Sequence, residues 1–123
     1  TLLVGDYVWE INGVLTPIFF ERKSLGDLYG TMTSGYERFR REMVLAQEWK
    51  WHLLLGLEDT LMTIRQGYEY STFSGDSCVQ KLFTLWAKYQ VQPVFCDGRR
   101  ELARYIEETF QAYERVSLER GSA

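Results

Sequence analysis

Residues 5–23, GDYVWEINGVLTPIFFERK, decide the fold of this chain. The Asn12-Gly13 pair near their centre is the strongest short signal for a two-residue hairpin turn, because both residues tolerate positive φ. Strand-forming Val, Ile, Trp, Tyr and Phe flank the pair, so we expect strands over 1–10 and 14–21. Pro17 has no backbone N–H, which predicts a sheet edge or a bulge near it.

The hairpin register predicts which side chains share a face. With a two-residue loop at 12–13, the numbers of paired residues add up to 25, which places Asp6 opposite Phe19. Asp6, Glu21 and Lys23 then point to the same side of the sheet. The two acids are diagonal neighbours with roughly 7–8 Å between their backbones. Two carboxylates can converge over that distance on one hard cation, although a bulge would shift the register by one residue.

Two carboxylates and a lysine on one strand face suggest metal-assisted chemistry. Mg²⁺ binds one or two protein carboxylates and keeps several waters. It can polarise a phosphoryl oxygen and activate a bound water, while a lysine stabilises charge that develops on the phosphate. The alternative is that residues 21–23 are a charged strand end that faces solvent, which is the commoner origin of an E-x-K triplet.

The rest of the chain predicts alternating helices and strands. A capping box at Ser24 and Asp27 starts a short helix, and residues 60–74 are ambiguous and read as a surface excursion. The other expected elements are a helix over 36–49, a strand over 51–57, a helix capped by Asp76 and ending near Tyr89, a strand over 91–96 and a final helix capped by Asp97. This order predicts one α/β domain over 1–123, with a disordered tail over 116–123.

Composition excludes several functional classes. The 123 residues are 46% hydrophobic and 25% charged, with a formal net charge of −3. No apolar run approaches the ~18 residues of a membrane helix, no secretory signal opens the chain, and neither a GxGxxG nor a GxxxxGKS/T nucleotide motif is present. The single histidine, His52, excludes a multi-His zinc site. Cys78 and Cys96 form no CxxC pair and read as reduced core thiols.

The motif residues resemble a known family. Gly5-Asp6, Glu21-Arg22-Lys23 and Asp27-Leu28 are similar to the GD…ERKxxxD signature of XPF-type nuclease domains, in the restriction-endonuclease-like superfamily. Residues 35–42 resemble the helix that follows this signature in small standalone phage and bacterial versions. Residues 53–58 and 91–101 resemble the later strands and the step into the last helix.

The resemblance implies a fold and an activity. The fold would be three-layered, with a central mixed sheet flanked by helices. The family usually places a strand and a helix before the GD strand, and we expect this chain to lack that element. The activity would be structure-specific endonucleolytic cleavage of branched, flapped or forked duplex DNA, as in DNA repair, with Mg²⁺ or Mn²⁺ as cofactor. The protein would be intracellular, cytoplasmic in a bacterium or phage and nuclear in a eukaryote.

The resemblance also assigns roles to individual residues. Asp6 and Glu21 would bind the metal, and Lys23 would be the catalytic lysine. Further matches near the active site, with auxiliary roles, are Arg22, Asp27 and Glu42.

DNA contacts must be local, because the chain is acidic overall. Arg38 is a candidate on the helix after the motif, whereas Arg40 and Arg41 read better as a solvated helix face. Arg99 and Arg100 fall in the first turn of the last helix, where the macrodipole disfavours cations. They either contact phosphates or pair with a nearby glutamate, Glu101 or Glu107.

Two further readings stay open, and assembly is a separate question. The chain could be a catalytically inactive nuclease-like scaffold that binds DNA or a partner subunit, or a plain α/β interaction domain. The resemblance also favours a homodimer, because relatives commonly pair their nuclease domains. The stripe Leu102, Ile106, Phe110 and Tyr113 on the final helix offers a face for pairing, although such a stripe is more often core.

Overall fold

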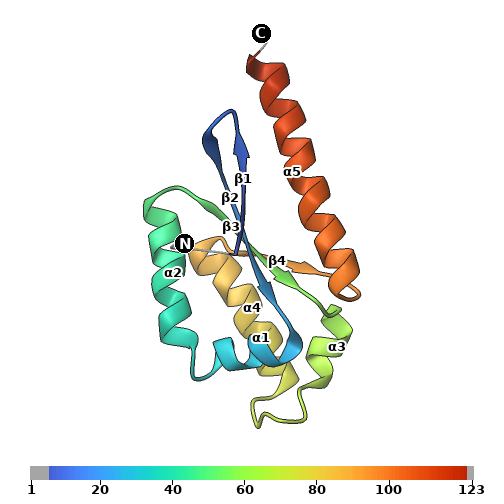
Figure 1. Cartoon of the computed structure of the whole chain (residues 1–123). Helices are drawn as coiled ribbons and strands as arrows, with labels where there is room; N and C mark the ends of the chain where they lie inside the picture. The colour runs from blue at the N-terminus through green and yellow to red at the C-terminus, as the bar shows by residue number, and fades with distance from the viewer. Residues whose placement is uncertain (1–5, 122–123) are drawn as a thin grey trace.

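The computed structural model describes residues 6–121, which form an α/β fold around one mixed sheet (Figure 1). The sheet order is β1-β2-β3-β4; β1 pairs with β2 antiparallel, and the two other pairings are parallel. The strands are β1 (Tyr7–Ile11), β2 (Val14–Lys23), β3 (His52–Leu57) and β4 (Gln92–Phe95). Residues 1–5, where the first predicted strand was expected to begin, lie outside the described residues.

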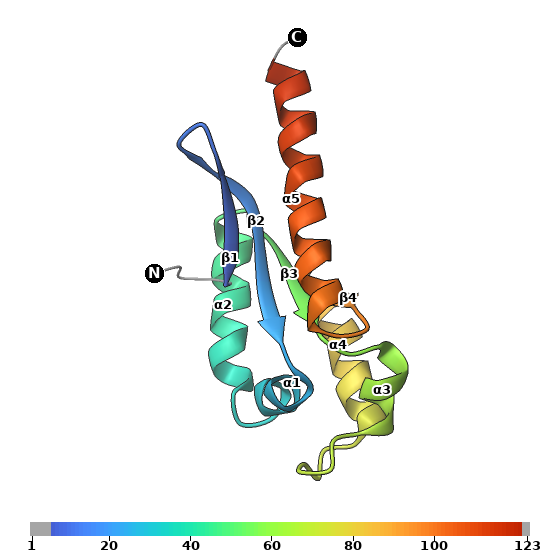
Figure 2. The same cartoon turned by 45° about the vertical axis from the view of Figure 1, so that its right-hand side comes forward.

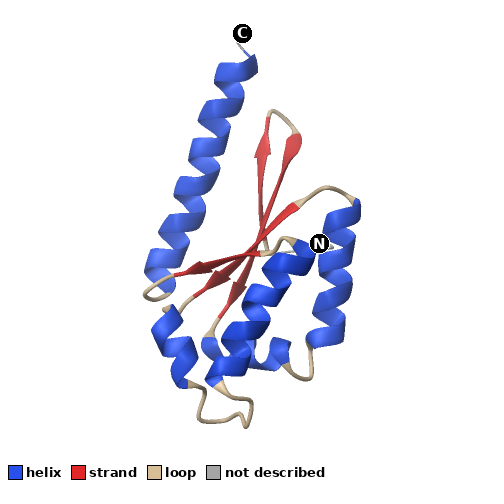
Figure 3. Ribbon diagram, turned by 180° about the vertical axis from the view of Figure 1, so that it is seen from behind, coloured by secondary structure: helices blue, strands red, loops and turns tan. Residues whose placement is uncertain are grey.

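Helices cover both faces of this sheet, which makes the fold three-layered. Side chains of successive strand residues point to opposite faces, so Phe19 packs with α1, α2 and α4 while Phe20 packs with α5. Figure 2 shows α2 and α5 on opposite sides of the sheet, and Figure 3 shows α4 and α2 together on the face seen from behind. The helices are α1 (Leu25–Met32), α2 (Tyr36–Glu48), α3 (Leu61–Gln66), α4 (Gly75–Tyr89) and α5 (Arg99–Gly121).

The hairpin register changes by two residues along its length. Near the turn the paired numbers add up to 25, as predicted; from the Val8–Phe19 pair onward they add up to 27. The irregularity lies at the level of Pro17, where the sequence predicts a bulge. The prediction that Asp6 lies opposite Phe19 is therefore wrong. Because side chains alternate with a period of two, a shift of two residues leaves Glu21 and Lys23 on the predicted face.

Several element boundaries differ from the predicted ones for local reasons. Ser74 caps α4 in place of Asp76, because the Ser74 hydroxyl accepts the Ser77 N–H at 3.1 Å. Within the predicted surface excursion, Thr60 caps the short helix α3 in the same way. Gly98, with φ 102°, precedes the first residue of α5, where Asp97 was expected to cap.

The final helix also runs further than expected. It continues to Gly121, through most of the segment predicted to be a disordered tail, since no glycine or proline interrupts residues 99–120. Figure 1 shows α5 extending past the body of the sheet, beside the hairpin tip. Its residues Leu102, Ile106 and Phe110 are buried against the sheet, so most of the stripe considered for homodimer pairing is core.

His52 is the first residue of β3 and is exposed. The prediction that both cysteines are core thiols is confirmed. Cys78 and Cys96 are both buried free thiols, and burial raises the pKa of each. No helix among residues 6–121 is long and apolar enough to cross a bilayer.

Candidate active site

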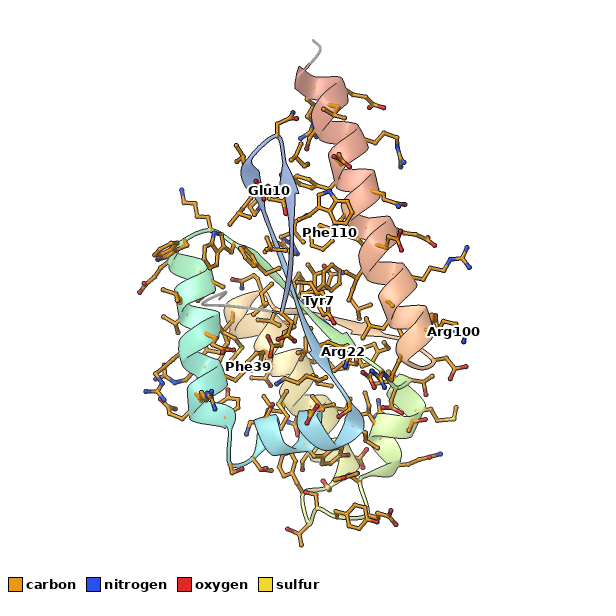
Figure 4. The ribbon with its side chains drawn as sticks, viewed as in Figure 1. Tyr7, Glu10, Arg22, Phe39, Arg100 and Phe110 are labelled. Carbon is orange, nitrogen blue, oxygen red and sulfur yellow. The ribbon has the colours of Figure 1, made fainter. Side chains whose placement is uncertain are left out.

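Strand alternation divides the Glu21-Arg22-Lys23 triplet between the two faces of the sheet. Glu21 and Lys23 line a cleft beneath helices α1 and α2, whereas Arg22 lines a separate pocket beside α5. Figure 4 shows Arg22 on β2 and Phe39 on the helix that walls the cleft. Arg22 therefore does not line the cleft, and its predicted auxiliary role stays a prediction.

The cleft is an open hollow of about 460 Å³ between the end of β2 and the two helices that follow it. Its walls are mostly polar or small, and they carry both signs of charge. The lining residues that bear charge are Glu21, Lys23, Asp27, Arg38 and Glu42. All five were singled out from the sequence as candidate site residues, and the structure brings them together around one cleft; their roles stay predictions.

Glu21 and Lys23 form an ion pair inside this cleft. The Lys23 Nζ lies 3.3 Å from Glu21 Oε1, and the two side chains are only 17% and 14% exposed, lysine first. The lysine ammonium also lies 5.9 Å from the centre of the Phe39 ring, within the range of a cation–π contact. A carboxylate and an ammonium are thus held together in a partly desolvated place, where charge interactions are stronger than in water.

Asp6 reaches the same strand from the end of β1. Its backbone N–H donates to the Phe20 carbonyl at 2.7 Å, and its Oδ2 accepts the Arg22 backbone N–H at 2.9 Å. The second carboxylate oxygen forms no hydrogen bond or ion pair with the residues that the structure describes. Among the described residues, one oxygen of Asp6 is therefore fixed on β2.

The carboxylates of the site repel one another. Burial is the main reason that the pKa of Glu21 is raised, and the charges of Asp6 and Glu42 add to it, while Lys23 opposes them. Burial also raises the pKa of Glu42, with Asp6 adding to the effect and Lys23 and Arg38 opposing it. A cation placed among these three acids would relieve this repulsion.

The donor set suits a hard divalent cation that keeps most of its water. Within residues 6–121 no group of three or more His, Cys, Asp or Glu side chains is close enough to form a complete cage. Mg²⁺ does not need such a cage, because it is commonly held by one or two carboxylates plus water and substrate phosphate. Asp6 and Glu21, with only oxygen atoms to offer, match that preference.

Across the sheet, Arg22 binds a glutamate that the sequence analysis did not single out. Its Nε lies 3.1 Å from Oε2 of Glu58, the residue after β3, and Arg99 Nε lies 3.9 Å from the same oxygen. Glu58 is far from Arg22 in sequence, and only the parallel register of β2 and β3 brings the two together. The partner of Arg99 is thus a glutamate, but neither Glu101 nor Glu107.

Of the remaining residues considered from the sequence, Asp27 lines the cleft, whereas Arg40 and Arg100 do not. Asp27 belongs to the predicted capping box, and its backbone N–H donates to Ser24 Oγ at 3.3 Å. Arg40 pairs with Glu37 along α2 at 3.0 Å, which agrees with its reading as part of a solvated face. Arg100 is exposed, and Figure 4 shows it on the outer side of α5, away from the sheet.

Comparisons with known proteins give one clear result. The family model of the ERCC4 domain matches residues 1–109, which is most of the chain. No curated protein matches the sequence.

Proposed function

Because the chain belongs to the ERCC4 domain family, a nuclease family that acts on DNA, we propose that it is a metal-dependent endonuclease that hydrolyses phosphodiester bonds in branched or flapped DNA. The family match agrees with the XPF-type resemblance of the motif. The observation that carries the proposal is the Glu21–Lys23 pair in an open polar cleft, with the Asp6 carboxylate fixed on the same strand.

Asp6 and Glu21 would hold Mg²⁺ or Mn²⁺ through carboxylate oxygens. When bound, such a cation polarises the phosphodiester and lowers the pKa of the attacking water. Lys23 Nζ stabilises the negative charge that develops on the phosphate oxygens. Its ion pair with Glu21 keeps the ammonium at the cleft before DNA arrives. Glu42 supplies a third carboxylate, whose raised pKa lets it retain a proton at a higher pH than an ordinary glutamate.

The cleft also offers groups for the DNA backbone. Arg38 lines it and is exposed, so its guanidinium can contact a phosphate next to the cleaved bond. Arg99 and Arg100 are exposed at the start of α5 and would contact DNA that extends to the other side of the sheet. With a net charge of −3, the chain needs such local clusters to bind a polyanion.

A panel of DNA substrates tests the proposal. The chain is incubated with a 5′-labelled flap, a fork and a plain duplex, in Mg²⁺, in Mn²⁺ and in EDTA. We expect cleavage near the junction of the flap or fork with either metal, little cleavage of the duplex, and none in EDTA. Absence of cleavage on all three substrates in both metals would favour the inactive DNA-binding scaffold instead.

Two further parts of the proposal concern the setting of the enzyme. Buried free thiols agree with an intracellular protein, where reducing conditions prevail. We also propose that the chain forms a homodimer. Its interface is not the stripe of α5, because Leu102, Ile106 and Phe110 are buried against the sheet. Sedimentation at micromolar concentration measures the mass of the assembly directly.

A further inference from the structure

Glu58 occupies a central place behind the cleavage cleft. Its side chain is 12% exposed, and its Oε2 lies 3.1 Å from Arg22 Nε and 3.9 Å from Arg99 Nε. A carboxylate so little exposed needs a cation, because leaving such a charge unpaired is costly. Arg22 supplies the closer of the two, and its own side chain is 38% exposed.

The backbone of Glu58, just after β3, is hydrogen-bonded to the end of β2 and to the turn before α5. Its N–H donates to the Lys23 carbonyl at 3.1 Å, and its carbonyl accepts the Gly98 N–H at 2.8 Å. The same residue thus bonds the end of β2 through both its main chain and its side chain. It also fixes the turn that leads into α5.

These contacts restrain Arg22, which lies between the two proposed cleavage residues of β2. Arg22 lies between Glu21 and Lys23, and its N–H is held by Asp6 Oδ2 while its side chain is held by Glu58. Asp6 therefore restrains Arg22 from the edge of the sheet, and Glu58 restrains it from the face beside α5. Any rotation of the Arg22 peptide would move the neighbouring acid and lysine away from the cleft, and displacements of 1 Å can cost about 100-fold in rate.

We propose that Glu58 is a positioning residue of the cleavage site, which acts through Arg22 to hold Glu21 and Lys23 in the cleft and the Arg22 N–H on Asp6. This inference rests on the proposed function. Glu58 stands on the far face of the sheet from the cleft and contacts no substrate. It should therefore affect the rate of the chemical step more than the affinity for DNA, to which its other neighbour Arg99 would contribute.

A double-mutant cycle tests the coupling. Glu58→Gln, Arg22→Gln and the double variant are compared with the wild type on flap DNA in Mg²⁺. We expect Glu58→Gln to lower kcat by about 10-fold to 100-fold, with KM for DNA little changed. The double variant should be no slower than the slower single variant, because both substitutions remove the same link. Multiplicative losses in the cycle, or a Glu58→Gln variant with wild-type kcat, would overturn the inference.

A control separates positioning from general loss of stability. Val79 is buried on α4, outside the cleft, so Val79→Ala lowers the melting temperature without touching Glu58 or Arg22. Assayed well below its melting temperature, this variant should keep the wild-type kcat. If Val79→Ala loses as much kcat as Glu58→Gln at equal stability, the effect of Glu58 is merely structural and the inference fails.

A spectroscopic arm keeps the inference testable if the wild type cleaves no DNA. The amide signal of Arg22 in a ¹H–¹⁵N spectrum reports its hydrogen bond to Asp6. Glu58→Gln should shift this signal and speed its hydrogen exchange, while Val79→Ala should leave its position unchanged. An Arg22 amide that is identical in wild type and Glu58→Gln would refute the positioning role, whatever the outcome for cleavage.

Discussion

The Asp6 carboxylate accepts the backbone N–H of Arg22 at 2.9 Å, so the acid at the end of β1 is attached to the middle residue of the Glu21-Arg22-Lys23 triplet. In a regular hairpin this N–H would donate to a backbone carbonyl of the neighbouring strand. Among the described residues, its acceptor is the side chain of Asp6. One carboxylate oxygen thus has a structural task, and the proposal gives the other to the metal.

Metal binding should stabilise the folded chain. A cation that binds only the native state raises the melting temperature with its concentration. We expect Mn²⁺ to raise it in the wild type, and EDTA to reverse the rise. Asp6→Asn should reduce the effect strongly, because an amide oxygen can still accept the Arg22 N–H but binds the cation weakly.

Glu37→Gln is the matched control for this measurement. Glu37 is an exposed acid on α2 that pairs with Arg40 and does not line the cleft. Its variant should respond to Mn²⁺ as the wild type does. Equal metal responses in all three proteins would contradict a site at Asp6.

The raised pKa of Glu21 makes a prediction about stability and pH. Because its pKa is raised in the folded state above the ordinary value of 4.5, the ionised side chain destabilises the native state at neutral pH. Below pH 4.5 the side chain is protonated in both states and the penalty disappears. Glu21→Gln should therefore stabilise the metal-free chain at pH 7, with the gain shrinking as the pH falls toward 4.5.

Denaturant unfolding of both proteins between pH 4 and pH 8 measures this difference. The wild type and the variant should converge at the acid end and separate toward neutral pH. A variant that is less stable than the wild type at pH 7 would show that the ion pair with Lys23 outweighs burial and repulsion.

Much of this fold could be predicted from local patterns, because turn chemistry and apolar spacing act over a few residues. Asn12-Gly13 does form the turn, with φ of 51° and 81°. The register beyond it could not be predicted, since the bulge near Pro17 adds two residues. Glu21 and Lys23 share a face in any register, because they are two residues apart on one strand. The even shift also keeps them on the expected side relative to β1.

The parts of the site that the sequence did not indicate depend on distant pairings. Glu58 is the clearest case, because its contacts with Arg22 arise from the parallel pairing of β2 with β3. The strand alternation that separates Arg22 from its two neighbours was available in the sequence. It would have placed Arg22 on the face opposite the cleft.

Arg38 should contribute to DNA affinity more than to chemistry. It is exposed and lines the cleft, whereas Arg41 on the same helix is exposed outside it. Arg38→Ala should weaken flap binding and make the slope of log affinity against log salt shallower by about 1. Arg41→Ala, the control, should leave the slope closer to that of the wild type. Equal slopes for Arg38→Ala and the wild type would exclude a phosphate contact.

Two glycines in helices should respond oppositely to alanine. A Cβ on Gly75 would overlap the Arg65 carbonyl oxygen, whereas a Cβ on Gly30 meets no atom within 4 Å. Gly75→Ala should destabilise the fold by about 1–3 kcal/mol or more. Gly30→Ala should stabilise it by about 0.5–1 kcal/mol, because alanine favours helix. Urea unfolding of the two variants checks the packing of α3 against α4; a tolerated Gly75→Ala would contradict it.

The most direct test of the account compares cleavage with binding in Lys23→Ala and Glu21→Gln. Single-turnover cleavage of flap DNA in Mg²⁺ is measured beside the DNA affinity of each protein in Ca²⁺. Cleavage depends on a cation and a lysine that act in the transition state, whereas affinity comes mainly from phosphate contacts. The account predicts that each variant loses most of the cleavage rate and retains DNA affinity close to that of the wild type. Wild-type cleavage rates in both variants would contradict the assignment of catalysis to this cleft.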